Sequence, residues 1–233
     1  MEIRELTTLA DFAEAVSLQK VIWNWSDLDI LPLRFFVVAR SIGGQALGAF
    51  DGKKMAGFCL AIPAIKPNGH AYLHSHMLGV LSEYRDAGTG RLLKFAQRDA
   101  ALARGFDLIE WTFDPLEIKN AYFNIERLGA VVRRFVLNQY GITSSPLAGG
   151  LPTDRCVAEW HIRKTRHYAP PSARISVPAS IGRMRQEDPS RARRIQGAIA
   201  DQFIAHFADN LAVTGFEITP DAGTYLLSPW PTE

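Results

Sequence analysis

The spacing of hydrophobic and polar positions predicts strands and helices along the whole chain. Short apolar and β-branched runs bounded by Gly, Pro, Asn or Asp are typical of strands. They cover residues 3–6, 45–50, 54–63, 72–80, 106–113, 131–138, 156–162, 174–177, 212–218 and 224–227. Longer segments with an apolar stripe predict helices at residues 9–23, 33–40, 91–104, 120–128 and 189–209. Mixed strands and helices with several hairpins favour an α+β (mixed α/β) fold.

The most informative stretch runs from Tyr72 to Gly105. A strand ends in Leu78-Gly79-Val80, and the turn Arg85-Asp86-Ala87-Gly88-Thr89-Gly90 leads into a helix. Glycines let a backbone approach a ligand closely. The start of a helix offers unpaired N–H groups and the positive end of its dipole. The stretch therefore predicts a phosphate-binding site.

Two common phosphate-binding turns do not fit this stretch. A P-loop ends in Gly-Lys-Ser/Thr, and the sequence has no such triplet. A dinucleotide-binding turn needs a third glycine three residues after the second, where this chain has Leu93.

The order and spacing of Leu78-Gly79-Val80, Arg85, Gly88-Thr89-Gly90 and Leu92-Leu93 resemble the coenzyme-binding segment of the GNAT N-acetyltransferases. The resemblance covers about residues 1–162 and implies a GNAT-like acyl-CoA-binding domain. Its central sheet would be mostly antiparallel and splayed at the cofactor site, with helices on both faces. Residues 163–233 would form a C-terminal strand–helix–hairpin extension that packs on the same domain.

The resemblance also implies an activity and a cosubstrate. The family transfers the acetyl group of acetyl-CoA to an amine, so this chain is expected to be an acyl-CoA dependent N-acyltransferase that uses direct attack. The acceptor would be an amine of a small molecule or a protein. The alternative hypothesis is a non-catalytic acyl-CoA binding or scaffolding protein with a degenerate site.

By position, the resemblance assigns coenzyme binding to the end of the strand, the turn and the start of the helix. These residues are Leu78, Gly79, Val80, Arg85, Asp86, Ala87, Gly88, Thr89, Gly90 and Arg91. It assigns a coenzyme-facing asparagine to Asn120 or Asn124. The turn departs from the family at Asp86 and Ala87, where glycine and a basic or polar residue are usual. A carboxylate close to pyrophosphate is expected to weaken binding.

Acetyl transfer to an amine needs a base for the amine's proton. Strand alternation predicts that His74 and His76 share a face with Leu78 and Val80, and an imidazole there would act as a base near neutral pH. Glu110 on the next strand is a further candidate base. Hydrogen-bonded or ion-paired structural roles remain open for all three side chains.

The departing thiolate also needs a proton donor. The family's tyrosine is replaced here by Ile125, so the usual acid is missing. Tyr122, about one turn earlier, is the substitute candidate, although an aromatic residue at helical spacing is also typical of packing.

The charge and hydrophobic content of the chain bear on whether it binds nucleic acid or a membrane. The formal net charge is +2 and 47% of residues are hydrophobic, so bulk charge indicates neither a nucleic-acid nor a membrane partner. Residues 163–194 hold nine Lys or Arg against Glu187 and Asp188, which leaves a nucleic-acid partner as a third and weaker hypothesis. The strands of the tail would allow a homodimer.

The cysteines, the start of the chain and the histidines bear on the compartment and on metal binding. Cys59 and Cys156 lie in apolar surroundings and are expected to be buried free thiols in a reducing compartment. The start of the chain has no signal-peptide pattern, so the protein is expected to be cytoplasmic. No carboxylate or cysteine completes a set with His70, His74 and His76, so no metal is predicted.

Overall fold

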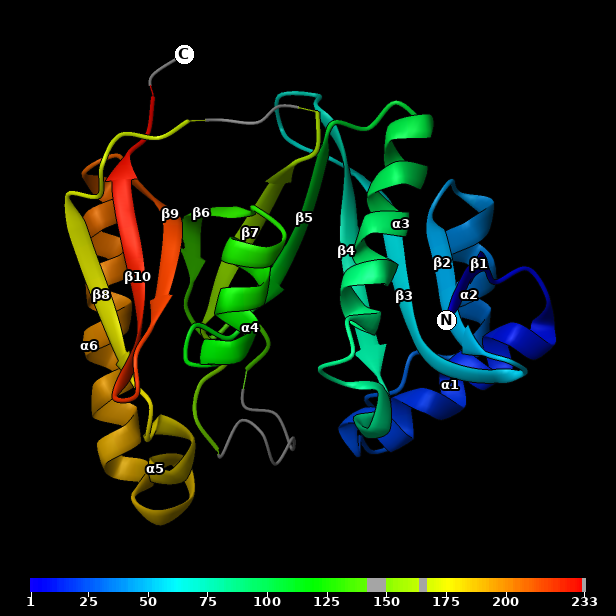
Figure 1. The fold of residues 1–233 in the computed structure, drawn as a ribbon, viewed down its shortest axis with the longest axis horizontal. Coiled ribbons are helices and arrows are strands. Elements are labelled where there is room, and N and C mark those ends of the chain that lie inside the picture. The colour runs from blue at the N-terminus through cyan, green and yellow to red at the C-terminus, as the bar shows by residue number, and fades with distance from the viewer. Residues whose placement is uncertain (142–149, 164–166, 232–233) are drawn as a thin grey trace. The chain divides into compact units, whose positions relative to one another are not determined.

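The computed structural model describes residues 1–141, 150–163 and 167–231, which contain ten strands and six α-helices (Figure 1). The strands are β1 (Glu2–Glu5), β2 (Gln45–Asp51), β3 (Lys54–Ile65), β4 (Ala71–Val80), β5 (Leu108–Phe113), β6 (Val131–Val136), β7 (Arg155–His161), β8 (Ala173–Pro178), β9 (Leu211–Ile218) and β10 (Ala222–Pro229). The helices are α1 (Leu9–Trp23), α2 (Leu33–Ser41), α3 (Thr89–Ala103), α4 (Ile118–Tyr122), α5 (Ile181–Glu187) and α6 (Pro189–Ala208).

The chain divides into two compact units, and the boundary falls inside β5. The first unit comprises Met1–Glu110 and His161–Arg163. The second comprises Trp111–Trp160 and the described residues 167–231, so the tail of the chain packs with residues 111–160.

In the first unit, β1 to β4 pair antiparallel in chain order, and β5 pairs parallel to β4 after the crossover through α3. Helices α1 and α2 cover one face with an apolar cluster that includes Phe12, Phe36 and Phe58. Helix α3 covers the other face, where Leu93 packs on Leu47 and Cys59. Helices on both faces of a mostly antiparallel sheet confirm the predicted mixed α/β fold.

A β-bulge in β4 changes which side chains share a face. Leu60 pairs with Met77 and Ala61 with Ser75, so His76 is an extra residue in β4. On the carboxyl side of the bulge, Leu78 belongs to the cluster under α3. On the amino side, His74 lies opposite Ile62, which packs on the cluster under α1 and α2. A simple alternation of side chains does not hold across this strand.

In the second unit, the strand order is β7-β6-β9-β10-β8, and α6 packs on β6, β8 and β9. Phe203 of α6 stacks on Phe135 at 5.1 Å between ring centroids and meets Tyr225 edge-on at 5.0 Å. Tyr225 is fully buried. The hairpin β9–β10 and strand β8 were predicted, whereas α5 was not, because its seven residues carry no clear apolar stripe.

Candidate functional site

The turn between β4 and α3 is tight and contains two residues with positive φ. A 3₁₀ turn, Ser82–Tyr84, is followed by two residues in the left-handed region, Asp86 at φ +59° and Gly88 at φ +83°. The left-handed region is natural for glycine and tolerable for Asp or Asn. A glycine would adopt the backbone conformation of Asp86 without strain, which the sequence alone did not reveal.

The first amide groups of α3 have neither a helical hydrogen-bond partner nor a side-chain cap in the described part of the chain. The helix begins at Thr89, two residues earlier than predicted, and its first main-chain bond runs from Leu92 N to Gly88 O at 3.0 Å. Among the described residues, no side chain caps this end, in contrast to α1, where Thr8 and Asp11 form a capping box. The N–H groups of Thr89, Gly90 and Arg91 precede the first helical bond and lie at the positive end of the dipole.

Charged side chains surround the turn. Arg85 Nε donates to Val80 O at 3.1 Å, which ties the mouth of the turn to the end of β4. The Arg91 guanidinium stands 5.1 Å from the Phe95 ring centroid. Asp86 and Ala87 are both exposed. Two arginines, Asp86 and the ion-paired Glu83 therefore lie around the turn.

The end of β4 is shaped by close packing. A Cβ on Gly79 would lie 2.8 Å from both Ile22 and Trp23 of α1, so this glycine is required by packing. A Cβ on Gly90 would lie 3.8 Å from Leu78 and Val80, which is ordinary van der Waals contact. A side chain can therefore be introduced at Gly90 without disturbing the fold.

The two candidate histidines share a face, but it is not the face of Leu78 and Val80. Their ring centroids are 5.9 Å apart, and His76 is also 5.9 Å from the ring of Phe35 in α2. The prediction that they lie with Leu78 and Val80 was wrong, because the bulge at His76 turns the strand between the two pairs. Burial lowers the pKa of the half-buried His74, and partial desolvation lowers the pKa of His76, which is exposed, so both are neutral near pH 7.

Glu110 lies beside this histidine pair. It is the register partner of His74 in the parallel pairing of β4 and β5, so the two side chains point to one face. Glu110 is 3% exposed, and its carboxylate is paired with Lys66 Nζ at 2.6 Å. The sequence singled out Glu110 but missed Lys66, which follows β3 in a turn that reads only as a loop. The structure thus brings His74, His76, Glu110 and Lys66 together.

A buried lysine lies on the α3 side of β4. Lys94 is 2% exposed, and its Nζ donates to Ser75 Oγ at 2.9 Å and to Gln97 Oε1 at 3.1 Å. Burial lowers the pKa of Lys94 to about 7. It also raises the pKa of the neighbouring Cys59 thiol to about 12, so this cysteine is a protonated, buried free thiol as predicted. Sequence reasoning missed Lys94, since a lysine in an amphipathic helix is expected on the solvent face.

The remaining candidates belong to the second unit. Asn124 is buried, accepts from Trp111 Nε1 at 3.2 Å and donates to Asn120 Oδ1 at 3.3 Å. Asn120 is exposed and remains able to meet a ligand. Tyr122 is half-buried beneath the Arg127 guanidinium, 5.3 Å from its ring centroid. Ile125 is buried within the π-helical turn Phe123–Arg127.

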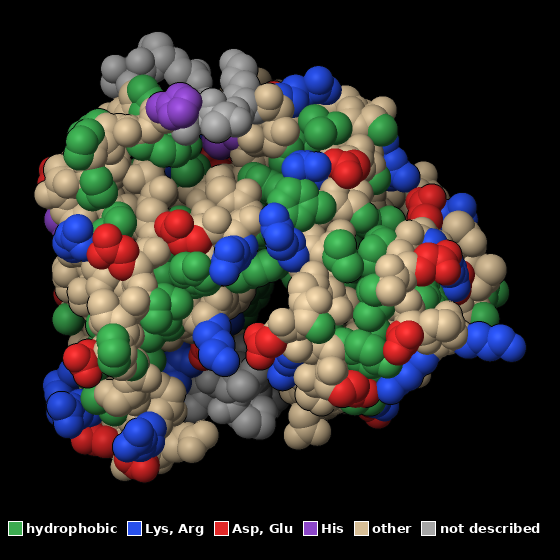
Figure 2. Space-filling model, in the orientation of Figure 1, with side chains coloured by type: hydrophobic (Ala, Val, Ile, Leu, Met, Phe, Trp, Pro, Cys, Tyr) green, Lys and Arg blue, Asp and Glu red, His purple; other side chains and the backbone are tan. Residues whose placement is uncertain are grey.

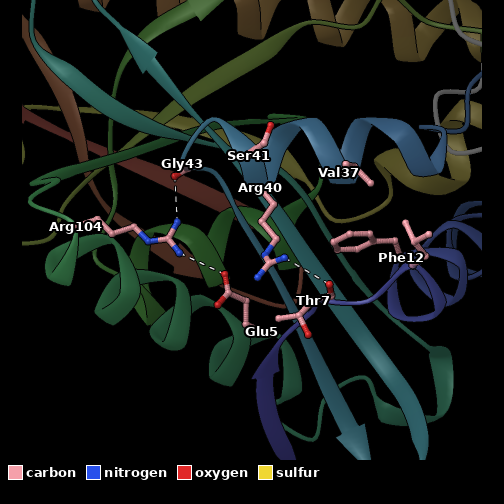
Figure 3. A pocket seen from close by; sticks show the side chains of 9 residues that line it. Glu5, Thr7, Phe12, Val37, Arg40, Ser41, Gly43 and Arg104 are labelled. Carbon is pink, nitrogen blue, oxygen red and sulfur yellow. Dashed lines mark hydrogen bonds and ion pairs between the residues drawn. The ribbon is translucent and has the colours of Figure 1, made fainter.

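The first unit also has an open pocket of about 700 Å³, distant in sequence from the turn (Figure 3). It is formed by residues at the end of β1, the start of α1 and the end of α2, with Phe12 and Val37 as its apolar side. Arg104 donates to Gly43 O at 3.1 Å and Gly44 O at 2.7 Å, so its guanidinium ties α3 to the end of α2. None of the candidate residues lines this pocket.

Other expectations concern charge, metals and membranes. On the face shown in Figure 2, Lys and Arg side chains lie among acidic ones at the end of the second unit that holds α5 and the start of α6.

Within residues 1–141, 150–163 and 167–231, no group of three His, Cys, Asp or Glu could hold a metal ion. No helix in the same ranges is long and apolar enough to cross a membrane.

Comparison with known proteins shows the fold. No protein-family model and no curated protein matches the sequence. Among solved structures, an aminoglycoside 6'-acetyltransferase type Ii aligns with a TM-score of 0.55 and 20% identity over 71% of this chain and 100% of its own. A putative GNAT-family acetyltransferase from Desulfovibrio desulfuricans aligns at 0.56 and 13% identity over 69% and 98%.

A third similar structure contains the expected cosubstrate. It is yncA, a putative acetyltransferase from Salmonella typhimurium solved with its cofactor acetyl-CoA, with a TM-score of 0.56 and 16% identity over 74% of this chain and 99% of its own. The chain therefore has the fold of the GNAT acetyltransferases. Each of these three alignments leaves at least a quarter of the chain without a counterpart.

Proposed function

We propose that the protein binds acetyl-CoA, or another acyl-CoA, at the β4–α3 turn and transfers the acyl group to an amine. The observation that carries this proposal is the uncapped start of α3 behind a turn with Gly88 in the left-handed region. Three consecutive amides and the helix dipole suit a pyrophosphate. The shared fold of yncA, which was solved with acetyl-CoA, supports the same ligand.

Coenzyme binding would be mainly a main-chain function. Thr89, Gly90 and Arg91 would donate amides to the pyrophosphate, and Arg85 would fix the turn through Val80 O. Leu78, Gly79 and Val80 would present main-chain groups to the pantetheine arm, as the family resemblance implies. Because such a site depends on backbone geometry, Ala87 is compatible with it, whereas the charge of Asp86 opposes it.

The transfer step would be direct attack of the amine nitrogen on the thioester carbonyl. The carbon–sulfur bond breaks as the carbon–nitrogen bond forms, and the amine loses a proton while the thiolate gains one. Neutral His74 or His76 would accept the amine's proton, with the Glu110–Lys66 pair beside them. Tyr122 remains the candidate donor to the thiolate, although its ring packs beneath Arg127.

Replacing His76 with glutamine is expected to lower kcat/KM about 100-fold, the usual contribution of a general base, while acetyl-CoA affinity stays unchanged. Wild-type activity should also fall at acidic pH, below the lowered pKa of the histidines, because an imidazolium cannot accept a proton. Thiol release with a panel of amines measures the rate. His70→Gln is the matched control, since His70 lies on the β3–β4 turn and bonds Asp107 at 2.8 Å. Unchanged rates in both His74→Gln and His76→Gln would refute the base assignment.

Replacing Asp86 with asparagine is expected to tighten acetyl-CoA binding about fivefold at low salt. It removes a repulsion on the order of 1 kcal/mol and keeps a side chain that tolerates the left-handed backbone at φ +59°. Calorimetry at low and high ionic strength should show the gain shrink as salt increases. An equal gain at all salt concentrations would mean that the charge of Asp86 is not responsible.

The second candidate function is a non-catalytic acyl-CoA binding or scaffolding protein. Asp86 in the turn and Ile125 in place of the usual acid favour it. The two hypotheses share the coenzyme and differ in turnover, so a protein that binds acetyl-CoA but releases no thiol with any amine would be the binder. Under both hypotheses the buried free thiols Cys59 and Cys156 favour a reducing, cytoplasmic setting.

A further inference from the structure

The open pocket of the first unit lies at the opposite end of the sheet from the β4–α3 turn. Strands β1 to β4 alternate in direction, so the end of β1 and the end of β4 lie at opposite ends of the sheet. Arg104, the residue after α3, lines the pocket, whereas the turn precedes α3. The length of this helix separates the two places by roughly 20 Å. The pocket is therefore distinct from the site proposed for the coenzyme.

One side of the pocket is apolar although it faces solvent. Leu9 is 64% exposed and Val37 is 40% exposed, and they line the pocket together with the buried Phe12. Exposed apolar side chains in a hollow offer a ligand apolar area to bury. The volume of about 700 Å³ is in the range of small-molecule sites. This side of the pocket suits a hydrocarbon chain or ring.

The other side carries a guanidinium whose charge is not balanced (Figure 3). Arg40 Nη1 donates to Thr7 O at 3.5 Å, a long hydrogen bond, and Arg40 forms no ion pair with any described residue. Arg104, in contrast, is paired with Glu5 at 3.3 Å and also donates to two main-chain carbonyls. Because the pocket is lined by two arginines and one glutamate, its net charge of +1 matches a single negative charge.

The start of α1 does not supply the anion-binding groups. Thr7 N and Thr8 N both donate to Asp11 Oδ2 at 3.1 Å, and Asp11 N donates to Thr8 Oγ1 at 3.1 Å. These amides are satisfied within the chain. The group that remains to meet an anion is the Arg40 side chain, and a guanidinium can donate two parallel hydrogen bonds to one carboxylate.

We propose that this pocket binds a small organic acid, in which one carboxylate is attached to an apolar chain or ring. The carboxylate pairs with Arg40, and the apolar part covers Leu9 and Val37 beside Phe12. A dianionic phosphate fits less well, because the pocket offers only one unbalanced positive charge. The same charge repels an ammonium group, so the pocket does not suit a cationic amine.

The first test titrates sodium hexanoate into the wild-type chain at low ionic strength, with calorimetry as the readout. We expect saturable binding that is at least about tenfold tighter than that of 1-hexanol or hexylammonium, because only the carboxylate forms a charge-assisted pair with Arg40. The affinity should increase from acetate through butyrate to hexanoate, roughly two- to fourfold for each methylene group that is buried.

The second test uses variants of α2. Arg40→Gln should weaken hexanoate binding about tenfold and leave the thermal transition unchanged, because the Arg40 side chain is exposed. Arg40→Lys keeps the charge without the planar guanidinium and should retain part of the affinity. Val37→Thr should reduce the dependence of affinity on chain length. Arg34→Gln is the matched control, because Arg34 is an exposed arginine of the same helix outside the pocket.

Three results would overturn the proposal. The first is no heat of binding with hexanoate at concentrations on the order of 10 mM. The second is equal affinity for hexanoate and 1-hexanol. The third is an equal loss of affinity in Arg40→Gln and Arg34→Gln, which would show a general attraction of anions to α2. None of these measurements involves the β4–α3 turn, so they decide on the pocket whether or not the chain binds acetyl-CoA.

Discussion

Replacing Gly90 with aspartate is expected to weaken acetyl-CoA binding at least about tenfold while making the folded protein more stable. Position 90 is the second residue of α3, and its Cβ would have 3.8 Å of clearance from Leu78 and Val80. A carboxylate there interacts favourably with the helix dipole and replaces a flexible glycine, which together contribute about 1 kcal/mol to stability. The same carboxylate would lie in the site proposed for pyrophosphate and repel its negative charge. A repulsion of about 1.4 kcal/mol gives a tenfold loss of affinity.

The opposite directions of the two effects make this variant informative. Calorimetry measures the affinity, and thermal or urea unfolding measures the stability. Gly90→Asn is the matched control, because it has the same size without the charge and should keep most of the affinity. Undiminished binding by a folded Gly90→Asp protein would place the pyrophosphate elsewhere.

Replacing Lys94 with methionine is expected to stabilise the protein at pH 7 by about 1–4 kcal/mol, the range seen when buried charges are exchanged for apolar side chains. Burial lowers the pKa of Lys94 to about 7, whereas an unfolded lysine titrates near its ordinary value of 10.5. Between these values the unfolded chain binds a proton that the folded protein does not. The free energy of unfolding of the wild type should therefore increase with pH across this window. Below the window Lys94 is protonated in both states and adds no pH dependence.

In Lys94→Met, the part of the pH-dependent increase in stability that comes from Lys94 should disappear. Ser75 Oγ and Gln97 Oε1 each lose a donor, which favours the lower end of the range. Urea unfolding from pH 6 to 10 measures the effect, and Lys53→Met removes the same charge from an exposed turn as a control. A pH profile equal to that of the wild type would show that Lys94 stays protonated in the folded protein.

The parts of the site that depend on local chain geometry were predictable from the sequence. Gly88 and Gly90 after an apolar strand indicated the turn and the helix start, and the structure has both. Glycine is one of the few residues whose presence directly reports backbone conformation. Gly52 has the same significance in the turn between β2 and β3, where its φ is +58°.

The parts that depend on register and on distant segments were not predictable. One extra residue at His76 changes the face on which the histidines lie, and no local residue type marks that bulge. The burial of Lys94 depends on Ser75, nineteen positions away in the chain. The ion pair from Arg185 to Asp114 spans 71 positions, and in the sequence Arg185 is simply one member of a basic run.

The most direct test of the central claim is a calorimetric titration of the wild-type chain with acetyl-CoA. The account predicts saturable binding of one ligand per chain, tightened by Asp86→Asn and weakened by Gly90→Asp. No heat of binding at acetyl-CoA concentrations on the order of 1 mM, from a protein shown to be folded by its thermal transition, would contradict it.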